Sequence, residues 1–364
     1  MKIDRVSTIR VRVPVDRGGA AIGWGGSTWS HLDTLLVRID TDAGVTGWGE
    51  AFGYNAIPAS RAAVDKMIAP LLIGRDPTQI NQLMHELQVQ MHLFGRYGAT
   101  MFALSGIDLA LWDIAGKLAN QPLHRLIGGA RRTELQAYAS LFKYNDAKTV
   151  ASLSEKALAE GYRMLKLHEF TVEPVAAARK VAGDAIPITL DVNCAWTPAQ
   201  GLEMAERLKL YNLYWLEEPV WPPENHAGLR AIREAGTPTA AGENACTAWE
   251  FRQMMDNEAV TFVQPSMTKV GGVSEFRKVV ALAESRNIRL APHSPYFGPG
   301  FLATLQLAAT LGPDVPVERF YCRLDGSLYG DLVVPKNGSY AVPMGPGLGQ
   351  DPDMDYVKSH TVEE

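Results

Sequence analysis

Cysteine is scarce in this chain of 364 residues, which contains only Cys194, Cys246 and Cys322 and no CxxC pair. Three cysteines spaced this widely indicate neither a disulfide framework nor a thiolate metal site. Cys194 and Cys246 each follow an acidic residue by three positions. Small buried core positions explain these cysteines better than nucleophiles do.

Long apolar runs and blocks of like charge are also missing from the sequence. No stretch of about 18 consecutive apolar residues occurs, and the N-terminal segment MKIDRVSTIRVRVPV alternates like a strand rather than resembling a signal peptide. These absences predict a cytoplasmic protein that does not enter a membrane. The formal net charge of -5 argues against a nucleic-acid surface.

The composition that remains is typical of a soluble enzyme, since 46% of the residues are apolar and 21% are charged. A chain of this length can bury a large core and is expected to form two domains. Residues 1–50 are predicted to form a β-meander, and residues 56–125 are predicted to be helical. Apolar residues from Leu104 to Leu118 recur at alternating spacings of three and four, which indicates one buried helical face.

The segment 16–31 separates the first two predicted strands and contains five glycines together with Trp24, Trp29 and His31. Glycine-rich backbone with large aromatic side chains is typical of a loop that closes over a site. An ordinary long hairpin connection is the alternative explanation.

From Leu135 onward, short apolar runs alternate with helical stretches, which predicts parallel strands joined by crossover helices. The predicted strand ends are Ser140, His168, Asp191, Glu217, Glu243, Ser266, His293 and Glu318. The last seven are separated by 23, 26, 26, 23, 27 and 25 residues, which is typical of successive βα units of one barrel. An open doubly wound sheet is the alternative, but no GxGxxG or GxxxxGK[ST] fingerprint is present. After residue 325 the turn-rich tail is predicted to return to the N-terminal domain.

Three of these strand ends carry carboxylates at equal spacing: Asp191 in ITLDVN, Glu217 in YWLEEPV and Glu243 in AAGEN. At one barrel mouth they would repel one another strongly unless a cation lay between them. Oxygen ligands favour a hard cation, and Mg2+ fits best because three carboxylates leave about three coordination positions for water or substrate.

A cation with open positions can bind a substrate carboxylate and stabilise the charge that forms when the adjacent carbon loses a proton. The candidate catalytic residues for this proton transfer are Lys166, His168 and His293. Lys166 and His168 alternate along one strand, so both are expected to face the barrel interior. The residues expected to contact substrate are Asn193, Glu318, Trp24, His31 and Tyr296. Pairing of Glu318 with the neighbouring Arg319 is the alternative for that carboxylate.

The motifs resemble the enolase superfamily, and specifically its mandelate racemase subgroup, over essentially the whole chain. The segment SGIDLALWDIAGKLANQPLHRLIGG resembles the last capping-domain helix of that family, and DVN, EEP and GEN match its three metal-ligand strands. KVGG and GPGLG match recurring turns further along the chain.

The resemblance implies an α/β fold, a modified TIM barrel of type (β/α)7β with an α+β capping domain. Residues 1–130 would form the cap with its specificity loop 16–31, residues 131–325 the barrel, and residues 326–364 a segment returning to the cap. It also implies Mg2+ on Asp191, Glu217 and Glu243, abstraction of a proton alpha to a carboxylate, and a homo-oligomer between a dimer and an octamer.

Two positions depart from the family pattern. The family usually has Lys-x-Lys on its second strand, whereas this chain has Lys166-x-His168. The subgroup usually pairs the histidine of the seventh strand with an aspartate on the sixth, but Ser266 occupies that position here. His293 is therefore expected to lack its carboxylate partner.

We expect a Mg2+-dependent dehydratase that converts an acid sugar to a 2-keto-3-deoxy acid, because histidines flank the predicted metal site on both sides. Cycloisomerisation of a lactone or anhydro sugar acid, or racemisation or epimerisation, is the alternative that shares the first proton transfer. A non-catalytic binding protein on the same scaffold is the alternative from another class.

Overall fold

The computed structural model describes residues 1–20 and 30–363 and has two parts, a barrel and a cap. The barrel contains parallel strands that hydrogen-bond in the order β10-β9-β8-β7-β6-β5-β4-β11. These strands are β4 (Glu134–Ser140), β5 (Leu165–Leu167), β6 (Ile188–Asp191), β7 (Trp215–Glu217), β8 (Thr239–Ala241), β9 (Phe262–Val263), β10 (Arg289–Leu290) and β11 (Val317–Phe320).

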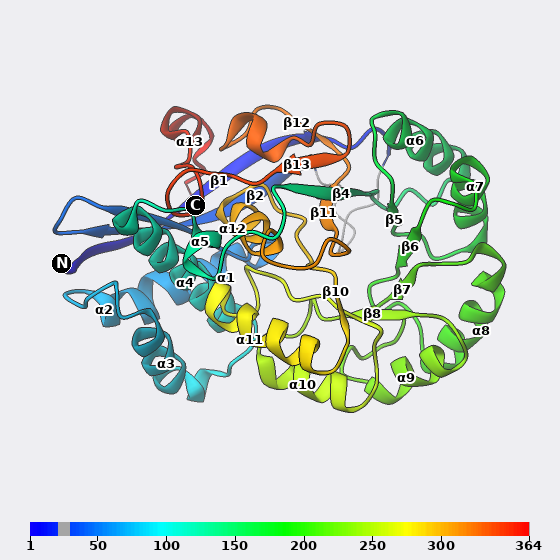
Figure 1. Ribbon diagram of the computed structural model, residues 1–364, viewed down its shortest axis with the longest axis horizontal. Coiled ribbons are helices and arrows are strands. Elements are labelled where there is room, and N and C mark those ends of the chain that lie inside the picture. Colours follow the sequence, from blue (N-terminus) through cyan, green and yellow to red (C-terminus); the bar gives the residue numbers. More distant parts are fainter. Residues whose placement is uncertain (21–29, 364) are drawn as a thin grey trace.

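One helix follows each barrel strand except the last, as in a (β/α)7β barrel, and Figure 1 shows these helices wrapped around the outside of the strands. They are α6 (Ala147–Ala159), α7 (Val172–Ala182), α8 (Pro198–Leu208), α9 (His226–Glu234), α10 (Ala248–Asp256), α11 (Gly272–Ser285) and α12 (Pro299–Ala308). Below the mouth the barrel interior is filled by buried side chains, including Tyr138, Trp215 and Phe262. Among the described residues, the polar groups that can meet a ligand therefore lie at the strand ends and in the loops that follow them.

The cap is built on an antiparallel sheet in the order β12-β1-β2-β3. Its strands are β1 (Ile3–Asp16), β2 (His31–Thr41), β3 (Thr46–Ala51) and β12 (Arg323–Leu324). Its helical segments are α1 (Ile57–Ala62), η3 (Ala63–Ile68), α2 (Ala69–Leu72), α3 (Ile80–Gln90), α4 (Gly98–Ala119) and α5 (Leu123–Leu126). Because β3 ends beside the barrel mouth, the residues that follow it can reach the site.

Helix α4 forms the centre of the cap and packs on β3 and on α11. It ends at Ala119, and Asn120, in the left-handed conformation, caps its last turn. By length and apolar composition α4 is the one helix among the described residues that could cross a membrane. However, 72% of its most apolar window is buried inside the protein, as expected for a core helix.

The C-terminal segment contacts both parts of the molecule. Strand β13 (Ser339–Ala341) pairs antiparallel with β4 of the barrel, and α13 (Met354–His360) lies beside β1 of the cap. Thr361 forms a bridge with Val11 of β1. The C-terminal segment therefore returns to the cap and lies beside a strand from the start of the chain.

Several predicted strand ends lie beyond the strands themselves. Strands β9 and β10 contain two residues each, and Ser266 and His293 come three residues after them, where they form an isolated parallel bridge with each other. Pro265 and Pro292 precede these residues and have no N–H to donate, so the regular ladder stops there. Glu318 is the second residue of β11 rather than its last.

Candidate metal and acid-base site

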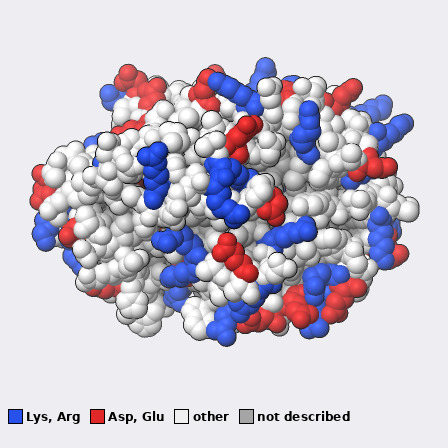
Figure 2. Space-filling model, viewed as in Figure 1, with Lys and Arg blue, Asp and Glu red and all other residues white. Residues whose placement is uncertain are grey.

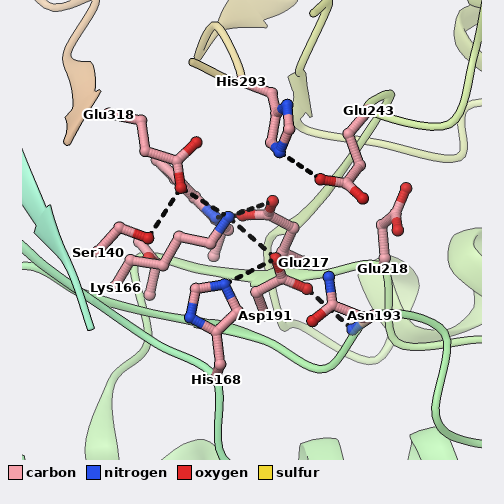
Figure 3. A network of polar contacts seen from close by, with 12 residues as sticks. Ser140, Lys166, His168, Asp191, Asn193, Glu217, Glu218, Glu243, His293 and Glu318 are labelled. Atoms are coloured by element: carbon pink, nitrogen blue, oxygen red, sulfur yellow. Dashed lines mark hydrogen bonds and ion pairs between the residues drawn. The ribbon is translucent and has the colours of Figure 1, made fainter. Parts of the chain in front are cut away.

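Three carboxylates from neighbouring strands meet at the barrel mouth. Asp191 and Glu217 are the last residues of β6 and β7 and are paired in register, and Glu243 follows β8 by two residues. One oxygen from each lies within 4.8 Å of the others. The structure thus brings together the three residues that the sequence predicts as metal ligands (Figure 3).

Lys166 on β5 lies among these carboxylates and is almost completely buried. Its Nζ is 2.9 Å from Asp191 Oδ2, 2.6 Å from Glu217 Oε1 and 3.2 Å from Glu318 Oε1. Burial alone would lower the pKa of Lys166, but the three carboxylates outweigh it and raise the pKa well above its usual value. Lys166 is thus a buried cation that holds Asp191, Glu217 and Glu318 together.

His168 faces the same cluster from two residues further along the chain. Its Nδ1 donates to the carbonyl oxygen of Leu141 at 2.5 Å, and its Nε2 is 3.4 Å from Asp191 Oδ2. Because a carbonyl oxygen can only accept, Nδ1 carries a hydrogen and Nε2 is the nitrogen available for proton exchange at the site.

His293 faces the cluster from the opposite side, after β10 (Figure 3). Its Nε2 is 2.5 Å from Glu243 Oε2, and its Nδ1 is 3.2 Å from both Ser266 Oγ and Tyr296 OH. As predicted, the expected carboxylate partner is absent, because Nδ1 faces the hydroxyl groups of Ser266 and Tyr296. The prediction did not foresee that the predicted metal ligand Glu243 contacts the other ring nitrogen, Nε2.

Glu318 closes the cluster on the side of the last barrel strand. Ser140 Oγ donates to Glu318 Oε1 at 2.9 Å, and the backbone N–H of Ser294 donates to Oε2 at 3.2 Å. Burial opposes ionisation, but Lys166 and the two histidines lower the pKa of Glu318. The alternative pairing with Arg319 is wrong, since Arg319 donates to the carbonyl oxygens of Phe320 and Cys322.

The charges of the cluster fit a divalent cation. Burial and the neighbouring Asp191 raise the pKa of Glu217 well above its usual range, while burial is outweighed at Asp191, whose pKa Lys166 and His168 lower. Keeping all these carboxylates ionised so close together is costly without further positive charge. Since Asp191, Glu217 and Glu243 offer only oxygen atoms, the donor set suits a hard cation.

A cavity of about 380 Å³ opens onto the cluster. Its lining includes Asp191, Glu243, His168, His293, Asn193 and Glu318 of the predicted site residues. It also includes residues that sequence reasoning did not select, namely Phe52, Tyr54, Cys194, Glu218, Trp221, Pro223, Asn244, Lys269, Pro295 and Phe320. A larger cleft of about 640 Å³ lies between the end of β1, α6 and the residues after β11, but it contains none of the clustered carboxylates. We place the site in the smaller cavity because its side chains carry the chemistry.

The remaining predicted substrate contacts lie elsewhere. Tyr296 is buried behind His293, with its hydroxyl group on Ser266. His31 lines a neighbouring pocket of about 220 Å³ that shares Tyr54 with the site cavity. Trp24 lies outside the described residues, so its predicted role stays a prediction.

Two cavity residues that the sequence analysis did not select, Glu218 and Lys269, differ in how far the sequence indicates them. Glu218 follows Glu217 directly, and its φ of +42° turns its side chain into the cavity, where Asn244 Nδ2 donates to it at 2.8 Å. Burial together with Glu243 and Asp191 raises the pKa of Glu218 to about 8. The acidic pair in LEEP is a signal for it. Lys269 begins the KVGG turn, but that motif does not predict its place over the Phe52 ring, 4.5 Å from the centroid, which depends on contact between two domains.

Comparison with known proteins shows the family to which this chain belongs. Residues 149–356 match a family model described as enolase C-terminal domain-like, and residues 8–128 match the N-terminal domain of mandelate racemase and muconate lactonizing enzyme. D-xylonate dehydratase of Haloferax volcanii is 33% identical over 90% of this chain and 85% of its own. D-galactarolactone cycloisomerase of Agrobacterium fabrum is 32% identical over 88% of this chain and 89% of its own. The structure of a racemase from Streptomyces coelicolor with bound magnesium superposes with a TM-score of 0.87 at 28% identity, covering 99% of this chain and all of the other.

Proposed function

This chain belongs to the mandelate racemase subgroup of the enolase superfamily, and from that premise we propose that it is an acid-sugar dehydratase. The substrate is a polyhydroxy carboxylate, the product a 2-keto-3-deoxy acid. The observation that carries this proposal is the placement of two histidines on opposite sides of one carboxylate cluster (Figure 3).

We propose Mg2+ as the cofactor, held by Asp191, Glu217 and Glu243. When bound, it supplies positive charge that stabilises the substrate carboxylate as the adjacent carbon loses its proton. The bound magnesium in the related racemase and the oxygen-only donor set support this choice.

The two histidines supply the proton transfers that dehydration requires. One Nε2 takes the proton alpha to the carboxylate, and the other gives a proton to the beta hydroxyl group, which leaves as water. The enol that results takes up a proton at C3 and becomes the keto acid. Lys166 keeps the carboxylates of Asp191, Glu217 and Glu318 in place during these transfers.

Cycloisomerisation is the second candidate, because D-galactarolactone cycloisomerase is almost as similar to this chain as D-xylonate dehydratase is. It uses the same alpha-proton transfer but keeps all atoms of the substrate. Racemisation or epimerisation would also begin with that transfer and would return the proton to the same carbon.

The test is incubation of the protein with Mg2+ in D2O and a stereochemically complete panel of acid sugars and their lactones, followed by mass spectrometry and NMR. A keto acid lacking one water supports dehydration, and an isomer without exchange at other carbons supports cycloisomerisation. Deuterium in recovered substrate without elimination supports epimerisation.

Glu217→Gln should abolish turnover, whereas Glu203→Gln on the exposed face of α8 should not. Absence of any turnover by the unaltered protein would leave the non-catalytic binding protein as the better description.

The other sequence-based expectations about partners stay predictions. The face of the molecule in Figure 2 carries Lys, Arg, Asp and Glu side chains interspersed, which suits a small-molecule substrate better than a polyanion. We propose a homo-oligomer and a cytoplasmic location. Light scattering of the purified protein tests the first, and fractionation of cells that express it tests the second.

A further inference from the structure

The capping domain contacts both segments that carry the hydroxyl partners of His293. The first segment includes Ser266 after β9, and the second runs from His293 to the start of α12 and includes Tyr296. These two hydroxyl groups hydrogen-bond to each other and face His293 Nδ1. The orientation of the imidazole therefore depends on where these two segments lie.

Glu50, near the end of β3 in the cap, anchors the second segment. Its Oε2 accepts a hydrogen bond of 2.8 Å from the backbone N–H of Gly300 at the start of α12. Pro299 has no N–H, so the Gly300 N–H is the first free donor of this helix, and an acceptor there is favourable.

The fit between Glu50 and this helix start is close. A Cβ atom added to Gly298 would lie 2.5 Å from Glu50 Oε2, and one added to Gly300 would lie 3.0 Å from it. Gly298 thus lets the backbone approach the carboxyl group, whereas at Gly300 the Thr268 side chain, 2.3 Å from the added Cβ, is the tighter neighbour. Glu50 is itself buried, with 5% of its surface exposed, so its contact is part of the packed interior.

The residues that follow Glu50 in the cap contact the same two barrel segments. The Phe52 N–H donates to the carbonyl oxygen of Thr268 at 3.3 Å, and the Phe52 ring packs edge-on against Tyr296 with 6.5 Å between centroids. Tyr54 OH donates to the carbonyl oxygen of Pro295 at 3.5 Å. The cap thus reaches the residues on both sides of the hydroxyl pair.

We infer that Glu50 is a positioning residue for the reaction: it holds the start of α12, thereby Tyr296, and through the Tyr296 hydroxyl group the ring of His293. Glu50 is not among the residues that line the site cavity, so its proposed role is to position His293 rather than to contact substrate. The inference rests on the proposed function for its link to turnover. The positioning of the His293 ring by Glu50 is argued from the contacts in the structure and does not depend on the proposed function.

The test compares Glu50→Ala with Glu50→Gln, because the glutamine amide keeps an oxygen acceptor for Gly300. Asp113→Asn is the matched control: Asp113 is also a buried carboxylate of the cap, and it accepts from the backbone N–H groups of Trp48 and Leu348, away from the site. The first readout is the NMR signal of the His293 imidazole in the Mg2+-loaded protein, assigned by its loss in His293→Asn. The second is kcat and KM for the substrate found in the panel.

Glu50→Ala should shift the His293 signal and lower kcat by about 10-fold or more, with KM changed less than about twofold, because a misplaced proton-transfer group affects the chemical step. Glu50→Gln should keep both readouts close to those of the unaltered protein. An unshifted His293 signal in Glu50→Ala, or an equal shift in Asp113→Asn, would overturn the inference. If the unaltered protein turns over no acid sugar, the proposed function has failed, and the NMR comparison still decides the positioning role.

Discussion

At the scale of single residues, His168 and His293 differ in the hydrogen-bond partners of Nδ1, the ring nitrogen that faces away from the carboxylate cluster. His168 has a carbonyl acceptor on Nδ1, whereas His293 has two hydroxyl groups. Hydroxyl groups can donate or accept, so His293 can lose and regain a proton while its hydrogen bonds reorganise. We therefore expect each histidine to serve a separate proton transfer.

His293→Asn should lower kcat by about 10²-fold or more, since general acid-base groups contribute at this level. The three carboxylates proposed to bind Mg2+ remain in this variant, so its affinity for Mg2+ measured by calorimetry should change little. His85→Asn, at an exposed position of α3, is the control for effects of a histidine substitution and of purification that do not involve the site. Unchanged turnover in His293→Asn would remove this residue from the mechanism.

His168→Ala should remove the transfer that starts on the β5 side. Exchange of the alpha proton with solvent and formation of product, followed separately in D2O, report which half-reaction is lost. If both continue at the original rates, His168 serves only in binding.

Lys166→Met should destabilise the protein, because it leaves Asp191, Glu217 and Glu318 buried without their ammonium partner. The expected loss in the free energy of unfolding is about 3–5 kcal/mol. Mg2+ should raise the melting temperature of this variant more than that of the unaltered protein, since the cation returns positive charge. The control is Lys358→Met, whose exposed pair with Asp355 should contribute less than about 1 kcal/mol. Equal effects of the two substitutions in urea unfolding would contradict this account.

At the scale of elements, the sequence predicts the barrel well where polar residues directly end apolar runs, as at Asp191 and Glu217. It predicts Ser266 and His293 as strand ends, whereas the structure places them three residues beyond β9 and β10, because prolines end the ladder while the chain direction continues. It also misses contacts made between domains. Glu50 is the last residue of the predicted meander and Phe52 follows it. Nothing in their local pattern shows that they reach residues more than 200 positions away.

The helix start at α11 provides a test of such contacts between elements. Gly272 has a φ of +74°, and a Cβ there would lie 2.4 Å from Asp108 Oδ2 of α4. Gly44 has a similar φ of +76° but open space around it. Gly44→Ala should therefore cost only the backbone strain of about 1–2 kcal/mol, and Gly272→Ala should cost about 1–3 kcal/mol more. Equal midpoints of urea unfolding for Gly44→Ala and Gly272→Ala would show that the contact between α4 and α11 can widen without loss of stability.

At the scale of the whole molecule, buried carboxyl groups between cap and barrel link stability to pH. Burial raises the pKa of Glu50 from about 4.5 to about 8, although the hydrogen bond from Gly300 opposes this. The folded protein therefore holds a proton that the unfolded chain releases, so this stabilisation is complete below pH 4.5 and is lost as pH rises through about 8. Asp108, whose pKa burial raises to about 7, acts in the same direction.

The expected result is that the free energy of unfolding falls with rising pH more steeply in the unaltered protein than in Glu50→Gln. The difference in slope should be roughly 1.4 kcal/mol per pH unit between about pH 5 and pH 7. Urea unfolding at fixed Mg2+ across this range measures it. Parallel slopes would mean that Glu50 is ionised in the folded protein.

The hydrogen bond between Ser140 and Glu318 joins the first and last strands of the barrel across 178 residues of chain. Strands β5 to β10 can form contacts with their neighbours as they are synthesised, but β4 has to wait for β11. During translation Lys166 thus lacks the carboxylate of Glu318 until almost the whole barrel has left the ribosome. Truncated or stalled chains will display an unpaired edge on β4, and this edge is where we expect chaperones to bind and aggregation to begin.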